Sequence, residues 1–140
     1  MMKSFDYKDA KRILQEKNHL NEIQKSIQNI ELTSKTSNGH KRIQKNLQDL
    51  RWETEARIFP VKTYPIDAFK DGTGIEIERS LIDAVHRTLF RSIWAYRNGT
   101  LNVLVFVLPL DKEPKFHLVK RDIRAFNDIL EYPIYLIGIK

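Results

Sequence analysis

Two runs of almost uninterrupted apolar residues constrain the fold of this chain more than any other feature. The first run, LNVLVFVL, covers residues 101–108, and the second, PIYLIGI, covers residues 133–139. A strand that is apolar on both faces has to be buried between two layers, as in the sheets of α/β proteins. Each run is also far too short to cross a membrane. We therefore expect two buried strands of one sheet, covered by helices, and no membrane partner.

The segments around these runs supply the covering helices. Apolar residues recur at spacings of 3, 4 and 3 at Leu20, Ile23, Ile27 and Ile30, which is the period of an amphipathic helix. The same period predicts helices over residues 6–17, 20–30, 40–52, 80–97 and 121–130, the last with Ile123, Phe126 and Leu130 facing inward. Residues 57–69 and 73–80 predict two strands, joined by a turn at residues 70–72 where glycine can take a positive φ. The predicted class is α/β.

The length and composition indicate one soluble domain. A chain of 140 residues can close a single hydrophobic core, so we expect one domain over residues 1–140, with a mainly helical part at 1–57 and the sheet with its helices at 58–140. The chain has no cysteine, which excludes disulfides, thiolate zinc sites and a cysteine nucleophile. The first residues carry charges where a signal peptide needs an apolar run, and we expect a cytoplasmic protein.

The charge balance is compatible with a polyanionic partner. The formal net charge is +6, and neutralising phosphates with lysine or arginine releases condensed counterions. A basic surface without a nucleic-acid partner is an equally good explanation of this value. Charge alone therefore leaves both alternatives open.

Three acidic residues near the middle of the chain are candidates for metal chemistry. In the predicted strand Gly74-Ile75-Glu76-Ile77-Glu78, side chains alternate, so both glutamates project to one face and both isoleucines to the other. The turn at residues 70–72 can bring Asp67 beside Glu76, which places three carboxylates around one point and favours a divalent cation. The alternative is an ordinary strand with a solvated acidic face. However, the strands that follow predict a sheet covered on both sides. Burying acidic side chains in such a sheet is costly, which favours a functional role for them.

These residues resemble a known motif. Pro65-Ile66-Asp67, then AFKDGTGI, then Glu76-Ile77-Glu78 is similar to the signature of restriction endonucleases of the PD-(D/E)xK superfamily, and most similar to its BglII and BamHI branch. The resemblance extends from the opening DYKDAKRIL to the closing YPIYLIGI. The usual lysine of the motif is replaced by Glu78, which is typical of that branch. A restriction-endonuclease-like core, with a central mixed sheet flanked by helices, is the fold that the resemblance implies.

The resemblance also implies an activity and a set of site residues. It implies a Mg²⁺-dependent endonuclease for double-stranded DNA, in which Mn²⁺ can substitute for Mg²⁺, acting as a homodimer without a small-molecule cofactor. Asp67, Glu76 and the backbone carbonyl of Ile77 would be metal ligands, and Glu78 would orient or deprotonate the attacking water. Arg79 and Ser80 at the strand end, and His86, Arg87 and Arg91 on the next helix, would contact DNA. An exposed helix position for His86, and an ion pair of Arg87 with Asp83, are the structural alternatives.

Two further alternatives concern the whole chain. It stops where relatives of this branch continue, which admits a minimal repair or defence nuclease of low specificity, and the fold could also serve as a non-catalytic DNA-binding or assembly module. The four histidines lack the spacing of a zinc site, and Trp52 and Trp94 are expected to be core or interface aromatics. The recognition sequence, the cleavage stagger and a companion methyltransferase do not follow from the sequence.

Overall fold

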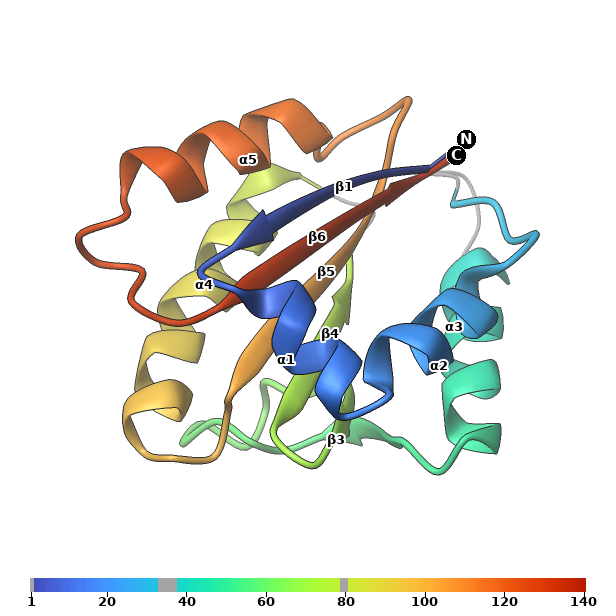
Figure 1. Cartoon of the computed structure of the whole chain (residues 1–140), viewed down its shortest axis with the longest axis horizontal. Coiled ribbons are helices and arrows are strands. Elements are labelled where there is room, and N and C mark those ends of the chain that lie inside the picture. The colour runs from blue at the N-terminus through green and yellow to red at the C-terminus, as the bar shows by residue number, and fades with distance from the viewer. Residues whose placement is uncertain (1, 33–37, 79–80) are drawn as a thin grey trace.

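A six-stranded mixed sheet lies between two layers of helices in the computed structural model, which describes residues 2–32, 38–78 and 81–140 (Figure 1). The elements in chain order are β1 (Met2–Tyr7), α1 (Ala10–Glu16), α2 (His19–Ile27), α3 (Asn38–Asp49), β2 (Glu53–Ala56), β3 (Ile66–Lys70), β4 (Thr73–Ile77), α4 (Ile82–Arg97), β5 (Val103–Pro109), α5 (Phe116–Ala125) and β6 (Ile134–Ile139). The predicted α/β class is confirmed.

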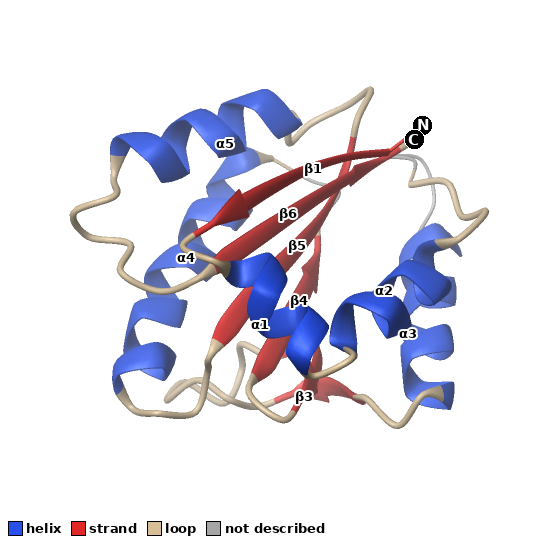
Figure 2. Cartoon of the chain, in the orientation of Figure 1, coloured by secondary structure: helices blue, strands red, loops and turns tan. Residues whose placement is uncertain are grey.

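The sheet has the order β1-β6-β5-β4-β3-β2 (Figure 2). Its centre is parallel, because β5 pairs in parallel with both β4 and β6. Both ends are antiparallel, where β1 pairs with β6, and where β3 pairs with β4 and β2. The first and last strands are neighbours, with Met2 opposite Ile139, so the two ends of the chain lie side by side (Figure 1).

The two apolar runs form the centre of the sheet and contribute to two separate cores. Val103, Val105 and Val107 of β5 pack in one cluster with apolar residues of α1, α2 and α3. Leu104 and Phe106, which point to the other face, pack in a second cluster with residues of α4 and α5. Every residue of β5 and β6 is buried, as the apolar runs predict for strands that are covered on both sides.

Several element boundaries differ from the sequence prediction. Residues 2–7 and 53–56 form the edge strands β1 and β2, within the part expected to be mainly helical. Residues 57–65 have no regular structure, and β3 begins only at Ile66, after the second of two prolines that restrict strand pairing. Helix α5 runs over 116–125 instead of 121–130, so Phe126, expected to face inward, lies beyond the helix end and is 54% exposed.

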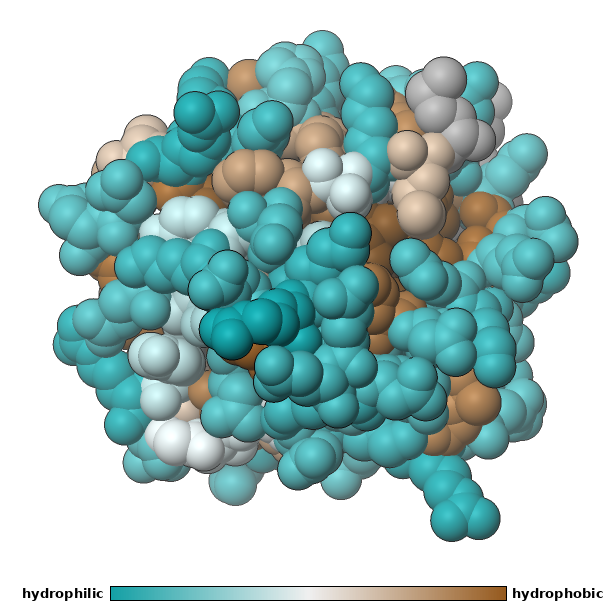
Figure 3. All heavy atoms as spheres, in the orientation of Figure 1, coloured by the Kyte–Doolittle hydropathy of each residue, from teal (hydrophilic) through white to brown (hydrophobic). Residues whose placement is uncertain are grey.

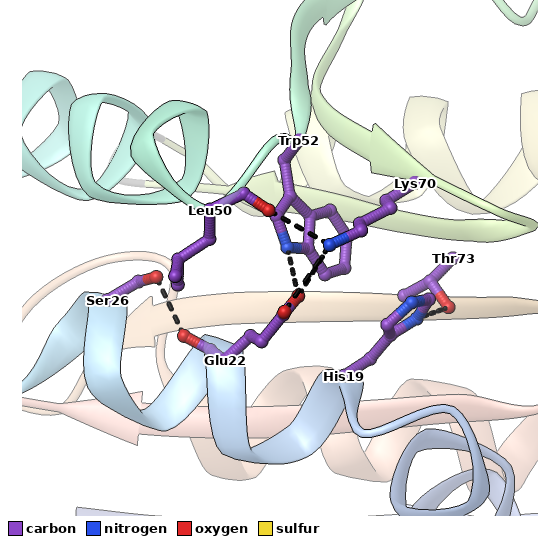
Figure 4. A network of polar contacts seen from close by, with 7 residues as sticks. All are labelled: His19, Glu22, Ser26, Leu50, Trp52, Lys70 and Thr73. Carbon is purple, nitrogen blue, oxygen red and sulfur yellow. Dashed lines mark hydrogen bonds and ion pairs between the residues drawn. The ribbon is translucent and has the colours of Figure 1, made fainter.

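The β3–β4 hairpin is held in place from the α2 side by a polar network (Figure 4). Lys70, the last residue of β3, donates to both carboxylate oxygens of Glu22 on α2, and also to the Leu50 carbonyl oxygen at 2.9 Å. The Trp52 indole N–H donates to the same Glu22 carboxylate at 2.8 Å. The predicted turn is also present, with Gly72 at a φ of 83°. The hairpin that carries Asp67 and Glu76 is therefore fixed at its turn.

The two sides of the molecule differ in their surfaces. Hydrophilic side chains cover most of the side that carries α1 and α2 (Figure 3). Most of the exposed large apolar side chains belong instead to α4 and to segments beside it, namely Val61, Tyr64, Leu81, Phe90, Trp94, Phe126 and Ile129. Within the described ranges, no helix combines the length and the apolar character that crossing a bilayer requires.

Candidate active site

Asp67 and Glu76 meet where β3 and β4 separate. The antiparallel ladder between these strands runs from Lys70–Thr73 to Ala68–Ile75. Beyond it, the Asp67 side chain takes over the pairing, because its Oδ2 accepts the backbone N–H of Ile77 at 2.7 Å. Glu76 points to the α4 side, where the Thr88 hydroxyl donates to its Oε2 at 3.0 Å. The structure thus brings together the two acids that the turn at residues 70–72 predicts as neighbours.

The two carboxyl groups shift each other's pKa in opposite directions. Burial raises the pKa of Glu76 well above its usual value, and the hydrogen bond and charge of Asp67 raise it further. Burial also opposes ionisation of Asp67, but hydrogen bonds from His40 and Glu76 outweigh it and hold the pKa of Asp67 below its usual value. Two like charges this close cannot both be ionised at low cost. The surroundings of the pair therefore oppose ionisation of Glu76 and favour ionisation of Asp67.

Glu78 lies just beyond the strand and does not complete a triad of acids. Its backbone N–H donates to the Val107 carbonyl oxygen at 3.0 Å, which extends the pairing of β4 with β5. Its charge contributes to the raised pKa of Glu76. However, no three His, Cys, Asp or Glu side chains in the described part of the chain are arranged to hold a metal ion. Asp67 and Glu76 are thus the two acids that the structure brings together, and the expected role of Glu78 stays a prediction.

Helix α3 contributes a residue to this site that the sequence reasoning missed. His40 Nε2 lies 3.0 Å from Asp67 Oδ1, and the Gln44 side-chain amide, one turn later, donates to the Asp67 backbone carbonyl at 3.0 Å. The two residues are separated from Asp67 by 27 and 23 positions. No local spacing connects residues so far apart, and the sequence analysis considers His40 only as a possible zinc ligand. The contact arises from the docking of α3 beside β3.

Comparison with known proteins places this geometry in a family. A family model described as restriction endonuclease BglII/BglIII matches residues 2–139. The chain belongs to the BglII/BglIII restriction endonuclease family. Membership makes it a type II deoxyribonuclease, which agrees with the class that its motif predicts. No curated protein sequence matches the chain significantly.

A solved structure has the same fold. The crystal structure of the restriction endonuclease BglII, complexed with a DNA 16-mer, matches with a TM-score of 0.84 at 15% sequence identity. The match covers 100% of this chain and 78% of that chain. The restriction-endonuclease-like core that the resemblance implies is therefore confirmed.

The residues expected to contact DNA have different surroundings in this restriction endonuclease. Arg79 and Ser80 lie outside the described residues. His86 is half-exposed, and its Nε2 lies 2.8 Å from Asp122 Oδ2 on α5. The Arg91 guanidinium lies over the Tyr64 ring, 3.5 Å from its centroid, while Arg87 is exposed at the edge of an apolar hollow. None of the three is shown to contact DNA, and their expected role stays a prediction.

A basic surface on α5 was not singled out by the sequence reasoning. His117, Lys120, Arg121 and Arg124 line one shallow depression. Arg121 is also paired with Asp122, through its Nη2 at 2.8 Å. The helical spacing of these residues could have been recognised, but the predicted helix began at 121 and so excluded the first two.

Proposed function

We propose that the chain hydrolyses phosphodiester bonds of double-stranded DNA with Mg²⁺, for which Mn²⁺ can substitute. Asp67, Glu76 and the backbone carbonyl of Ile77 would hold the metal. The observation that carries the proposal is the pair of adjacent carboxyl groups of Asp67 and Glu76, in which burial and Asp67 raise the pKa of Glu76, in a chain of a restriction endonuclease family. Closely placed acids with perturbed pKa values are typical of functional sites.

The donor set fits a hard divalent cation. Carboxylate and carbonyl oxygens are the ligands that Mg²⁺ prefers, and Mg²⁺ usually keeps several waters and binds one or two carboxylates. Two acids therefore suffice, even though no three acidic or histidine side chains of the described residues form a metal-binding group. The cation would relieve the repulsion between the two acids when both are ionised.

Each residue has a separate part in the proposed reaction. When bound, the metal polarises a phosphate oxygen and lowers the pKa of a bound water. Asp67 stays in place through its hydrogen bond from Ile77, and Thr88 orients Glu76. Glu78 orients the attacking water and takes its proton. The water oxygen bonds to phosphorus, and the bond from phosphorus to the 3′ oxygen breaks.

Basic residues on α4 and α5 support DNA as the substrate. Arg79, Ser80, His86, Arg87 and Arg91 remain the proposed DNA contacts. The depression on α5 that is lined by Lys120, Arg121 and Arg124 adds further positive charge to the same layer. Together with the net charge of +6, these side chains favour a polyanion through counterion release.

We include a homodimer in the proposal, because the α4 side carries a continuous apolar surface. Phe90 is 75% exposed and lines two adjoining hollows, one together with Trp94 and the other together with Phe126 and Ile129. Large exposed apolar patches mark interaction sites. In a symmetric dimer, each active site would cut one strand of the duplex.

Plasmid cleavage tests the proposal directly. Wild-type protein with Mg²⁺ is expected to cut supercoiled DNA, while Asp67→Ala and Glu76→Ala should each reduce the rate at least about 100-fold, more than the loss of a supporting residue around a metal. Asp49→Ala is the matched control, because Asp49 is an exposed acid on α3 that forms an ion pair with Lys45.

The cleavage products distinguish a site-specific enzyme from a nuclease of low specificity. Discrete bands, with one sequence at the ends, indicate a site-specific enzyme, and a smear indicates a nuclease of low specificity. Cleavage that survives both acid substitutions would show that the metal site lies elsewhere.

A further inference from the structure

Both oxygens of the Asp67 carboxylate are engaged before any metal is bound. Oδ2 accepts the Ile77 N–H at 2.7 Å, and Oδ1 lies 3.0 Å from His40 Nε2. Since an ionised carboxylate can only accept, the hydrogen of this contact lies on the imidazole Nε2. Each carboxylate oxygen has two lone-pair sites, so these two hydrogen bonds leave further sites for the contact with Glu76 or for a cation. The two contacts fix the plane of the carboxylate without blocking it.

The fold holds His40 firmly in this position. Residue 39 is glycine, and a Cβ there would collide with the backbone carbonyl of Glu31, so the start of α3 can pack close to the loop that follows α2. One turn after His40, Gln44 donates to the Asp67 carbonyl and to Glu55 Oε1, both at 3.0 Å. The side chain of His40 is 21% exposed and that of Asp67 is 12% exposed. The contact is thus mostly shielded from water.

We propose that His40 is a positioning residue for Asp67, which presets the carboxylate for the metal; this inference rests on the proposed function. A ligand that is already oriented loses less conformational freedom when the cation arrives. Residues that hydrogen-bond a metal ligand from outside typically change metal affinity or activity by 10–100-fold when they are removed. His40 comes from the α1–α3 layer, whereas Glu76 faces α4, so the two helical layers each support one acid of the pair.

The chain offers a matched control for this inference. Gln44 lies on the same helix and contacts the same residue, but it binds the Asp67 backbone and leaves the carboxylate untouched. Loss of helix docking would follow from Gln44→Ala as much as from His40→Ala. Loss of carboxylate orientation would follow only from His40→Ala. His40→Gln keeps an N–H donor of similar reach and should restore the orientation.

Mn²⁺ binding without DNA gives a readout that is independent of cleavage. The EPR signal of free Mn²⁺ would be titrated with wild type, His40→Ala, His40→Gln, Gln44→Ala and Asp67→Ala, with thermal unfolding measured for each. His40→Ala should weaken Mn²⁺ binding about 10–100-fold. His40→Gln should recover most of that loss. The Mn²⁺ affinity of Gln44→Ala should stay within about threefold of wild type, even if its melting temperature falls as much as that of His40→Ala.

Two outcomes would overturn the role of His40. One is wild-type Mn²⁺ affinity in His40→Ala, and the other is an equal loss in His40→Ala and Gln44→Ala, which would assign the effect to helix docking. Failure of the proposed function looks different: Asp67→Ala would then bind Mn²⁺ as wild type does, or wild type would not bind it at all.

Discussion

At residue scale, ionisation of the buried Glu76 lowers the stability of the folded protein. Burial and Asp67 raise the pKa of Glu76, while in the unfolded chain the group titrates at about 4.3. At a pH between the unfolded and the folded pKa of Glu76, the folded protein keeps a proton that the unfolded chain has lost. The stability contributed by Glu76 is therefore complete at acidic pH and falls as the pH rises through its folded pKa.

Glu76→Gln should therefore stabilise the metal-free protein in a pH-dependent way. The glutamine amide cannot ionise, and it can donate to Asp67 as the protonated carboxyl does. We expect the free energy of unfolding to rise by roughly 0.5–2 kcal/mol at about pH 8, the usual gain from removing a strained functional group, and by less at about pH 5. Urea unfolding in the presence of EDTA at both pH values measures the difference.

The control for this prediction is Glu16→Gln, at the exposed end of α1. It should change stability equally little at both pH values. A gain for Glu76→Gln that does not grow with pH would contradict the protonated pair, and so would a loss at pH 8.

The site residues differ in how visible they are in the sequence. Asp67 and Glu76 can be predicted because strand alternation and one tight turn, at Gly72, relate them locally. His40 cannot, because its contact with Asp67 depends on how α3 docks against β3 across 27 residues. Alternation predicts Glu78 on the same face as Glu76, but β4 ends at Ile77, and alternation does not reveal where a strand ends.

At the scale of elements, the network around Glu22 couples helix α2 to the hairpin of β3 and β4 (Figure 4). Burial opposes ionisation of Glu22, but hydrogen bonds from Lys70 and Trp52 outweigh it and lower the pKa of this carboxyl. The Lys70 and Glu22 side chains are only 29% and 20% exposed. A group with a lowered folded pKa contributes stability above its unfolded pKa, and this contribution is lost as the pH falls through the folded value.

Lys70→Met should therefore destabilise the protein by about 1–3 kcal/mol at neutral pH, because it leaves the Glu22 carboxylate and the Leu50 carbonyl with fewer donors. The loss should shrink as the pH falls through the lowered folded pKa of Glu22, because Glu22 then becomes protonated in the wild type too. Adding Glu22→Gln should recover part of the loss, with a coupling energy of about 0.5–3 kcal/mol for residues in contact. Chemical denaturation of the wild type, the two single variants and the double variant gives this coupling energy as a double-mutant cycle.

An exposed ion pair provides the comparison. Lys45 and Asp49 on α3 lie 2.7 Å apart, but their side chains are 68% and 60% exposed. Lys45→Met should change stability by no more than about 0.5–1 kcal/mol, as is usual for surface pairs. Equal losses for Lys70→Met and Lys45→Met would mean that the network does not anchor the hairpin.

The edge strands show why some elements escape prediction. Residues 2–7 are mostly exposed, with only Tyr7 buried, so no apolar alternation distinguishes β1 from the helix that follows. Its strand character comes from pairing with β6 at the other end of the chain. In contrast, β5 and β6 are apolar on both faces and could be recognised from their composition alone.

At the scale of the whole molecule, the sheet separates two cores and the candidate site connects their layers. One core covers the face packed by α1, α2 and α3, and the other covers the face packed by α4 and α5. Asp67 is held from the first layer through His40, and Glu76 from the second through Thr88. A partner that binds α4 would therefore act on the side of the molecule that supports Glu76.

The apolar surface on that side leads to the last prediction, which concerns assembly. Phe90 is the most exposed of the large apolar side chains and links the two hollows along α4. Phe90→Asp should weaken self-association by more than about tenfold, because it places a charge at the centre of the proposed interface. Met2→Asp is the control, since Met2 is 51% exposed but lies on the edge strand β1. Sedimentation velocity over a range of concentrations measures both.

Cleavage products connect this assembly to function. A dimer with one site per strand linearises a supercoiled plasmid in one binding event, whereas a monomer cuts one strand and releases nicked circles. Phe90→Asp should therefore accumulate nicked circles while keeping the Mn²⁺ affinity of wild type, because Asp67 and Glu76 are untouched. Met2→Asp should linearise plasmid as wild type does. A wild-type protein that sediments as a monomer and still linearises plasmid without nicked intermediates would contradict the proposal that each subunit of a dimer cuts one strand.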